Sequence, residues 1–142
     1  MAVETEDLVR RFYMDALGEG DLAGLDDFVT TAYMEHDPLP GQGDGLDGLK
    51  DRLTMLREGL APHFTIEDVI SEGDKLVVRW TNSGTHVGDF LGIPATNKRF
   101  SVAGIDIYRL VDGKLAEHWH VVDQLAMLQQ LGLIPAPENA GA

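Results

Sequence analysis

Apolar residues recur three or four positions apart in three segments of the first half of the chain. Between residues 8 and 17 this spacing predicts an amphipathic helix, which the glycines at 18 and 20 end. Between residues 22 and 29 it predicts a shorter helix that Asp21 can cap. Between residues 46 and 60 it predicts a third helix, ended by Gly59 and Pro62. Three leading helices are therefore expected.

From residue 64 onward, β-branched and aromatic residues gather in short runs separated by turn residues. Residues 64–71 and 75–84 are predicted strands joined across EGDK, and residues 102–110 and 115–122 are joined across VDGK. Asp123 can cap a closing helix. Helices followed by antiparallel hairpins predict an α+β domain, with helices packed over one face of a curved sheet. We expect one domain over residues 1–134 and a mobile tail over 135–142.

The register of the last hairpin decides which face its polar residues take. With a two-residue turn at positions 112–113, Asp106 opposes Trp119 and points away from His120. With a three-residue loop whose glycine is left-handed, Asp106 opposes His118 instead. We favour the second register because it separates polar from apolar residues. One face then carries Gly104, Asp106, Tyr108, Ala116, His118 and His120, and the other carries Ile105, Ile107, Trp119 and Val121.

The polar face of this hairpin has more than one interpretation. A sheet with one wet face shows the same alternation, so Asp106, His118 and His120 could simply be solvated. If they line a cavity, an imidazole and a carboxylate can divide acid and base roles. The pair His118 and His120 could also hold a divalent metal with His36, His86 or Asp106, although no further ligand spacing supports a metal. For the aromatic residues, ordinary core packing competes with stacking on a flat substrate.

Composition narrows the classes of partner. The chain has 142 residues, 24 acidic against 11 basic, and a formal net charge of −13. Such a charge repels phosphate backbones and anionic lipid, so nucleic acid and membrane surfaces are poor partners. There is no cysteine, which excludes thiolate catalysis and disulfides. Acidic residues near the N-terminus and the lack of an apolar run predict a cytoplasmic protein.

Several motifs together resemble a known family. HVGDFLGIPATNKRFS at 86–101, then YRLVDGK, then a strand ending at Asp123 and a helix running to QLG are similar to the SnoaL-like polyketide cyclases of the NTF2-like superfamily. The YMEHDP piece at 33–38 fits the same pattern. The resemblance implies a cone of helices closed by a curved, mixed, largely antiparallel sheet around a cavity, and a homodimer or higher homo-oligomer. It also implies cofactor-free closure of a carbocycle by an intramolecular aldol reaction.

Individual positions of the family can be carried over to this chain. His120 occupies the strand position where the type cyclases carry a general acid/base Asp, and Asp106 occupies the position of their His. His36 corresponds loosely to a pocket Asn, and Gly104 replaces a pocket Gln. The ionisable pair is thus kept in kind but exchanged in place. The resemblance also supports the three-residue loop, because both exchanged positions face the family's cavity.

We therefore expect a cyclase in which His120 and Asp106 perform acid/base catalysis on a hydrophobic aromatic polyketide ester. No cofactor and no metal are expected. The alternatives are an NTF2-like hydroxylase, epoxide hydrolase or isomerase acting on a polycyclic or terpenoid substrate, or a non-catalytic dimer that binds a small molecule. His36 or His118 would hydrogen-bond the developing enolate oxygen. The residues expected to contact substrate are Phe12, His36, Trp80, Gly104, Tyr108 and His118.

Overall fold

The helices lie mainly in the first half of the chain, as the apolar spacing predicts. The computed structural model describes residues 2–135. Helix α1 (Ala2–Arg10) continues directly into the π-helical turns η1 (Arg11–Gly18), α2 spans Gly45–Leu60, and α3 spans Gln124–Gln130. The side chain of Asp123 accepts a hydrogen bond from the Ala126 amide, so the predicted cap of α3 is confirmed. Of the predicted mobile tail, residues 136–142 lie outside the described residues.

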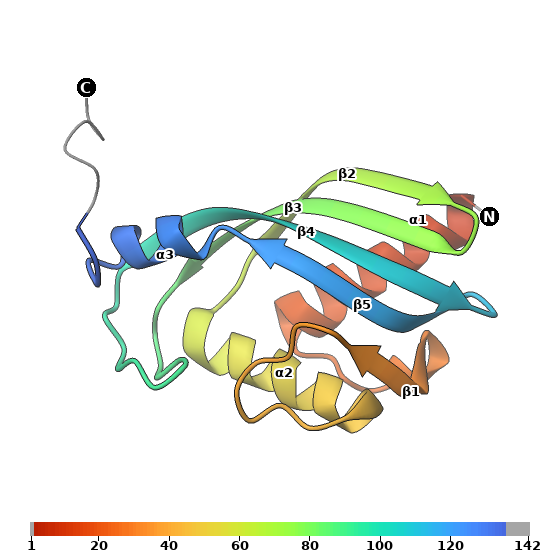
Figure 1. The fold of residues 1–142 in the computed structure, drawn as a ribbon, viewed down its shortest axis with the longest axis horizontal. Helices are drawn as coiled ribbons and strands as arrows, with labels where there is room; N and C mark the ends of the chain where they lie inside the picture. Colours follow the sequence, from red (N-terminus) through yellow and green to blue (C-terminus); the bar gives the residue numbers. More distant parts are fainter. Residues whose placement is uncertain (1, 136–142) are drawn as a thin grey trace.

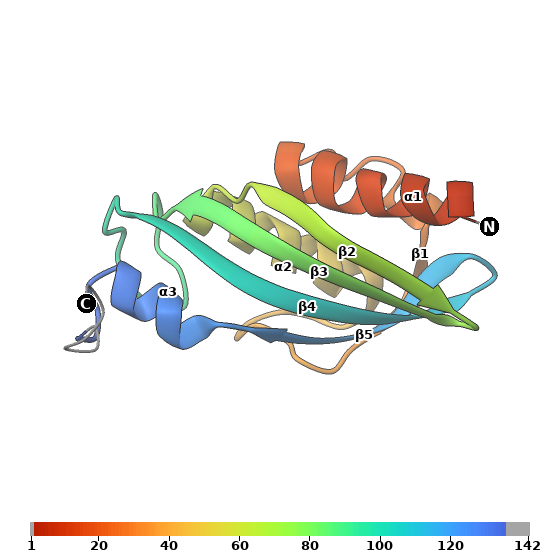
Figure 2. The same ribbon diagram turned by 90° about the horizontal axis from the view of Figure 1, so that it is seen from above.

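A five-stranded sheet forms the other layer. Its strands are β1 (Val29–Glu35), β2 (Phe64–Glu72), β3 (Lys75–Thr85), β4 (Arg99–Val111) and β5 (Lys114–Val122). They lie in the order β1-β5-β4-β3-β2, with β1 parallel to β5 and the other pairs antiparallel. Figure 1 shows α1 and α2 on one side of this sheet, and Figure 2 shows how its long strands bend. This is the mixed, mostly antiparallel sheet with packed helices that the sequence predicts.

The second predicted helix is reduced to a single 3₁₀ turn, η2 (Leu25–Asp27). Gly24 before it is left-handed, and Val29 already begins β1. Three apolar residues of this segment are nevertheless buried, namely Leu25, Phe28 and Val29, which are 1%, 7% and 1% exposed. The spacing thus identified buried positions correctly, but it did not identify the backbone conformation, which is a 3₁₀ turn followed by a strand. Strand β1 is an edge strand of the sheet, so it pairs with β5 on one side and with no other strand of this sheet.

The β4–β5 hairpin differs from the predicted one in its turn and in its register. Its turn has two residues, Asp112 and Gly113, with φ of 51° and 77°. Leu110 pairs with Leu115 and Arg109 pairs with Glu117, so Ala116 is an extra residue, a β-bulge. The bulge shifts the register by one, and Asp106 therefore pairs with His120 rather than with Trp119 or His118. The predicted loop is wrong, but the predicted sharing of one face holds.

The two faces of the hairpin have opposite surroundings. On the inner face Asp106, Tyr108 and His118 are buried, between the sheet and the helices. On the outer face Ile105, Ile107 and Val121 are exposed. The polar face is therefore the enclosed one, which excludes the interpretation that its residues are merely solvated. Among residues 2–135, no helix is both long and apolar enough to cross a bilayer.

Candidate functional site

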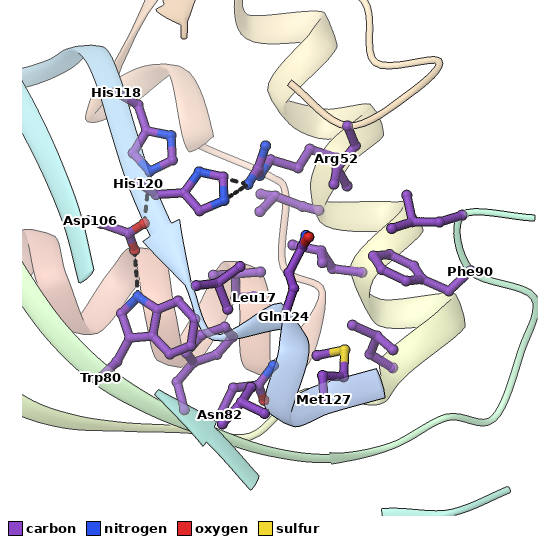
Figure 3. Close-up of a pocket in the computed structure, with 18 of the residues that line it drawn as sticks. Leu17, Arg52, Trp80, Asn82, Phe90, Asp106, His118, His120, Gln124 and Met127 are labelled. Carbon is purple, nitrogen blue, oxygen red and sulfur yellow. Dashed lines mark hydrogen bonds and ion pairs between the residues drawn. The ribbon is translucent and has the colours of Figure 1, made fainter. Parts of the chain in front are cut away.

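A cavity of about 260 Å³ lies between the helices and the inner face of the sheet. This is slightly below the usual range for small-molecule pockets. Figure 3 shows Asp106, His118 and His120 on one side of it and Phe90 and Met127 on another. Most of the wall is hydrocarbon, contributed by η1, α2, α3 and the loop after β3. Its polar residues are Tyr33, Arg52, Asn82, His86, Asp106, Tyr108, His118, His120 and Gln124.

Asp106 is buried among three hydrogen-bond donors. Its Oδ2 accepts from the Tyr13 hydroxyl at 2.5 Å and from Trp80 Nε1 at 2.7 Å, and its Oδ1 lies 2.8 Å from His118 Nε2. Burial alone would raise the pKa of this carboxyl group. The hydrogen bond and charge of His118, aided by Tyr13 and Trp80, outweigh burial and hold the pKa below its usual value. Asp106 is therefore an ionised carboxylate whose oxygens are already occupied.

His118 lies between two carboxylates. Its Nε2 faces Asp106, and its Nδ1 lies 2.7 Å from Oε2 of Glu35. Burial disfavours the charged ring, but the hydrogen bonds and charges of Asp106 and Glu35 raise its pKa to about 9. At neutral pH the ring is an imidazolium that donates from both nitrogens. Both of its hydrogen-bond donors are used by protein groups, so His118 cannot donate to the substrate without losing one of these bonds.

His120 has the opposite electrostatic surroundings although its ring stacks on that of His118, with centroids 5.3 Å apart. Arg52 Nη2 lies 3.4 Å from each of its ring nitrogens. Burial, then the positive charges of Arg52 and His118, lower the pKa of His120 below its ordinary value. The ring is consequently neutral at pH 7 and lines the cavity. Its backbone N–H donates to Asp37 Oδ2 at 2.9 Å, which fixes the strand position.

Glu35 and Arg52 complete this cluster, and the sequence interpretation missed both. Their side chains are 6% and 10% exposed, and Arg52 Nη1 lies 3.5 Å from Oε1 of Glu35. A signal for Arg52 was available, because it falls between Leu49 and Leu53 on the apolar face of α2. A signal for Glu35 was the alternation along β1, where Tyr33 is buried and the next residue is exposed.

All three aromatic residues predicted to contact substrate, Phe12, Trp80 and Tyr108, line the cavity, and so does His118. Gly104 does not line it, because the indole of Trp80 covers this position. A Cβ atom on Gly104 would lie 2.2 Å from Cζ2 of Trp80. The absent side chain is what allows the indole to cross the strand and reach Asp106. Gly104 therefore acts through Trp80, and its place behind the indole gives no support to the prediction that it contacts substrate.

His36 is the other predicted substrate-contacting residue that lies outside the cavity wall. It directly follows the inward-facing Glu35, so its side chain points to the opposite side of the chain. Its ring stacks on Trp119 at 4.7 Å, and its Nε2 lies 2.6 Å from Glu117 Oε2. The position of His36 outside the cavity wall therefore gives no support to the prediction that it binds the enolate oxygen, and the alternation of β1 explains this position.

Potential metal ligands gather at Glu35, His118 and His120, whose ligand atoms lie within 4.8 Å of one another. Two features of the cluster oppose a cation. The nitrogens of His118 already face two carboxylates, and the guanidinium of Arg52 contacts both Glu35 and His120. A divalent ion would have to displace the guanidinium of Arg52, whose charge already compensates that of Glu35. The donor set thus fits an ion-pair network better than a metal site.

His86 is a buried residue at the end of β3, 1% exposed. Its Nδ1 accepts from the Thr96 backbone N–H at 3.3 Å and lies 3.1 Å from the Thr96 hydroxyl. Its backbone also pairs with Asn97 and Lys98. These contacts close the loop between β3 and β4 over the cavity and give His86 a structural role.

Comparison with known proteins gives a consistent picture. A model of the SnoaL-like polyketide cyclase family matches residues 7–131. The aklanonic acid methyl ester cyclase DnrD of Streptomyces peucetius is 31% identical over 141 residues, covering 94% of this chain and 94% of the relative. The nogalonic acid methyl ester cyclase of Streptomyces nogalater is 41% identical over 117 residues, covering 81% and 84%. The structure of TsrD from Streptomyces laurentii superposes with a TM-score of 0.85 at 35% identity, covering 93% and 97%.

Proposed function

This chain belongs to the SnoaL-like polyketide cyclase family, and from that premise we propose that it closes a ring of an aromatic polyketide methyl ester by an intramolecular aldol reaction. The bond between a proton and the carbon next to a carbonyl breaks, and a carbon–carbon bond forms to a second carbonyl of the same molecule. The proton ends on the oxygen of that second carbonyl. No electrons are gained or lost, so the reaction as proposed needs no redox cofactor.

The observation that carries this proposal is the neutral imidazole of His120 on the cavity wall. A general base must be unprotonated at the working pH and must reach the bound substrate. His120 meets both requirements, whereas the neighbouring His118 is already protonated. In the proposed reaction His120 takes the proton from carbon and later returns it to the new alkoxide. Its lowered pKa makes the protonated ring a good acid for that second step.

Asp106 has an indirect part in this proposal. It does not hydrogen-bond His120, and its oxygens contact Tyr13, Trp80 and His118. It therefore acts as a positioning residue that keeps His118 charged. The His118 imidazolium, stacked on His120, helps to keep that ring neutral. The sequence analysis assigned acid/base catalysis to His120 and Asp106 together, whereas this proposal gives the proton transfer to His120 and the positioning role to Asp106.

The curated relatives favour cyclisation over the other activities considered. The two curated relatives described above are an aklanonic acid methyl ester cyclase and a nogalonic acid methyl ester cyclase. The cavity wall agrees with a substrate of that kind, because aromatic and aliphatic side chains surround a small polar cluster. Hydroxylation, epoxide hydrolysis and isomerisation have no comparable support, and neither has a purely binding role.

The proposal is tested by turnover of aklanonic acid methyl ester and nogalonic acid methyl ester. We expect His120→Ala to lower kcat by at least about 100-fold, the lower end of general acid–base contributions. His63, an exposed residue directly before β2, supplies the matched control His63→Ala. Full turnover by His120→Ala, with the product verified by mass and chromatography, would reject the assigned base.

A homodimer is a separate proposal that rests on the outer face of the sheet. Ile105, Ile107 and Val121 are 43%, 38% and 75% exposed there. Neighbouring exposed apolar residues of this kind are typical of surfaces that a partner covers. Sedimentation of the wild-type chain and of Val121→Lys tests the proposal. A dimer that Val121→Lys dissociates would support this surface, and a monomeric wild type would reject it.

A further inference from the structure

The proposed reaction needs a hydrogen-bond donor to the enolate oxygen, and no residue has yet been assigned this role. Removal of a proton next to a carbonyl places negative charge on the carbonyl oxygen, which needs a hydrogen-bond donor in a low-dielectric site. The two histidines first expected to serve are excluded. His118 has both nitrogens engaged by carboxylates, and His36 lies outside the cavity. A further donor on the wall beside His120 is therefore required.

Arg52 is held rigidly at this place by one half of its guanidinium group. Nη1 donates to the Asp37 carbonyl at 3.0 Å and to Gln42 Oε1 at 3.2 Å, and lies 3.5 Å from Glu35 Oε1. These three acceptors come from the end of β1 and the loop before α2. The side chain itself comes from α2. The end of β1 and the loop before α2 thus fix the guanidinium without using Nη2.

Nη2 retains hydrogen-bonding capacity. Among residues 2–135 its hydrogen-bond partners are limited to the ring of His120, at 3.4 Å from each ring nitrogen. A neutral imidazole has one acceptor nitrogen, and 3.4 Å is longer than the usual 2.7–3.2 Å for nitrogen donors. Nη2 carries two hydrogens. At least one of them is therefore available to an oxygen atom bound beside His120 (Figure 3).

The separation of these two groups suits an enolisable fragment. In a ketone or ester the carbonyl oxygen and the carbon that loses the proton are about 2.4 Å apart, from standard bond lengths. A base and a donor 3.4 Å apart can therefore meet the carbon and the oxygen of the same fragment. The surrounding wall is apolar, with Leu49, Leu53 and Leu56 beside Arg52 on α2. Such surroundings strengthen an interaction between a cation and an oxyanion.

We propose that Arg52 is a catalytic residue, whose Nη2 donates to the enolate oxygen formed when His120 removes the proton from carbon. This inference rests on the cyclase function proposed above. The electron pair of the carbon–hydrogen bond moves onto the oxygen held by Arg52, and the proton moves to His120. As the carbon attacks the second carbonyl, the charge leaves that oxygen and His120 protonates the new alkoxide. Arg52 is then returned to its starting state.

The experiment compares Arg52→Met and Arg52→Lys with Arg57→Lys in turnover of aklanonic acid methyl ester. Arg57 lies on the same helix but donates to the carbonyls of Leu17 and Gly18, so it is a structural arginine. We expect Arg52→Met to lower kcat by about 100- to 1000-fold, with KM changed less than about threefold, because an oxyanion donor acts mainly in the transition state. Arg52→Lys should lie between, since it keeps the charge but not the planar donor.

Each result separates the inference from the function on which it rests. A wild type that turns over the ester beside an Arg52→Met variant of equal kcat would overturn the role of Arg52 and leave the cyclase standing. An effect confined to KM would also overturn it, because that indicates uniform binding. A wild type inactive on both methyl esters would reject the function and this inference together. If Arg52→Met does not fold, as judged by circular dichroism, Arg52→Lys against Arg57→Lys decides by the same kcat criterion.

Discussion

Oδ1 of Asp106 lies 2.8 Å from Nε2 of His118, in a part of the molecule where both side chains are almost completely buried. Glu35 holds the other nitrogen of the same ring. Glu35 also contacts Arg52, and Arg52 lies next to the ring of His120. The charges of Asp106, His118, Glu35 and Arg52 therefore alternate in sign along the cluster. Alternating charges compensate one another in a site that water does not screen. Stability and the proposed acid/base function therefore depend on the same few residues.

The first prediction concerns stability against pH. The pKa of His118 rises from 6.5 to about 9 on folding. A raised pKa contributes stability that is fully present below 6.5 and is lost as pH rises through about 9. We expect the free energy of unfolding to fall by about 3 kcal/mol between pH 6 and pH 9.5. Urea denaturation at several pH values measures it.

Glu35→Gln and His63→Gln provide the comparison for this measurement. Glu35 is one of the two carboxylates that raise the pKa of His118, so Glu35→Gln should show a smaller loss over the same pH range. His63 is exposed, and His63→Gln should behave as the wild type does. A wild-type unfolding free energy that stays constant from pH 6 to pH 9.5 would contradict the charged state assigned to His118.

The second prediction concerns the two stacked histidines directly. At pH 7 NMR should show His118 as an imidazolium and His120 as a neutral ring, although their centroids are 5.3 Å apart. Arg52→Met should raise the pKa of His120, because the guanidinium charge is one cause of its lowering. Titration of the ring protons measures this shift without any substrate. An unchanged pKa of His120 in Arg52→Met would show that the guanidinium does not act on this ring.

The β4–β5 hairpin shows how far sequence reasoning reaches for the fold. Alternation of polar and apolar residues correctly placed Asp106, His118 and His120 on one face. It could not determine how the chain achieves this, because a three-residue loop and a two-residue turn with a bulge give the same parity. The bulge at Ala116 leaves no clear mark in the sequence. Face assignment was thus predictable, whereas the exact pairing was not.

The site shows a different limit. His120, His118 and Asp106 could be found because strands impose a simple alternation on ionisable residues. Glu35 and Arg52 are brought to them from 83 and 68 residues away in sequence. Such contacts depend on how β1 and α2 dock against the hairpin, which local patterns do not specify. The absence of a side chain at Gly104 was visible in the sequence, but only the structure shows that the indole of Trp80 takes its place.

The third prediction tests that compensation. Gly104→Ala places a Cβ 2.2 Å from Trp80 Cζ2 and should displace the indole from Asp106. We expect a loss of about 1–3 kcal/mol in unfolding free energy, typical of overpacking in a core. Trp80→Phe removes both the clashing ring and the Nε1 donor. The double variant should therefore be more stable than the sum of the two single effects implies. Strict additivity in urea denaturation would show that the two positions are independent.

The last prediction concerns His36, which the sequence placed in the site and the structure places outside it. Its ring stacks on Trp119 and its Nε2 faces Glu117, so neither contact reaches the cavity. We expect His36→Ala to leave kcat for aklanonic acid methyl ester within about twofold of the wild type. The free energy of unfolding should change little, because the side chain of His36 is 36% exposed. Parallel assays of His36→Ala and His120→Ala compare the two histidines under one set of conditions. A loss of kcat in His36→Ala as large as that in His120→Ala would mean that His36 turns into the cavity when substrate binds.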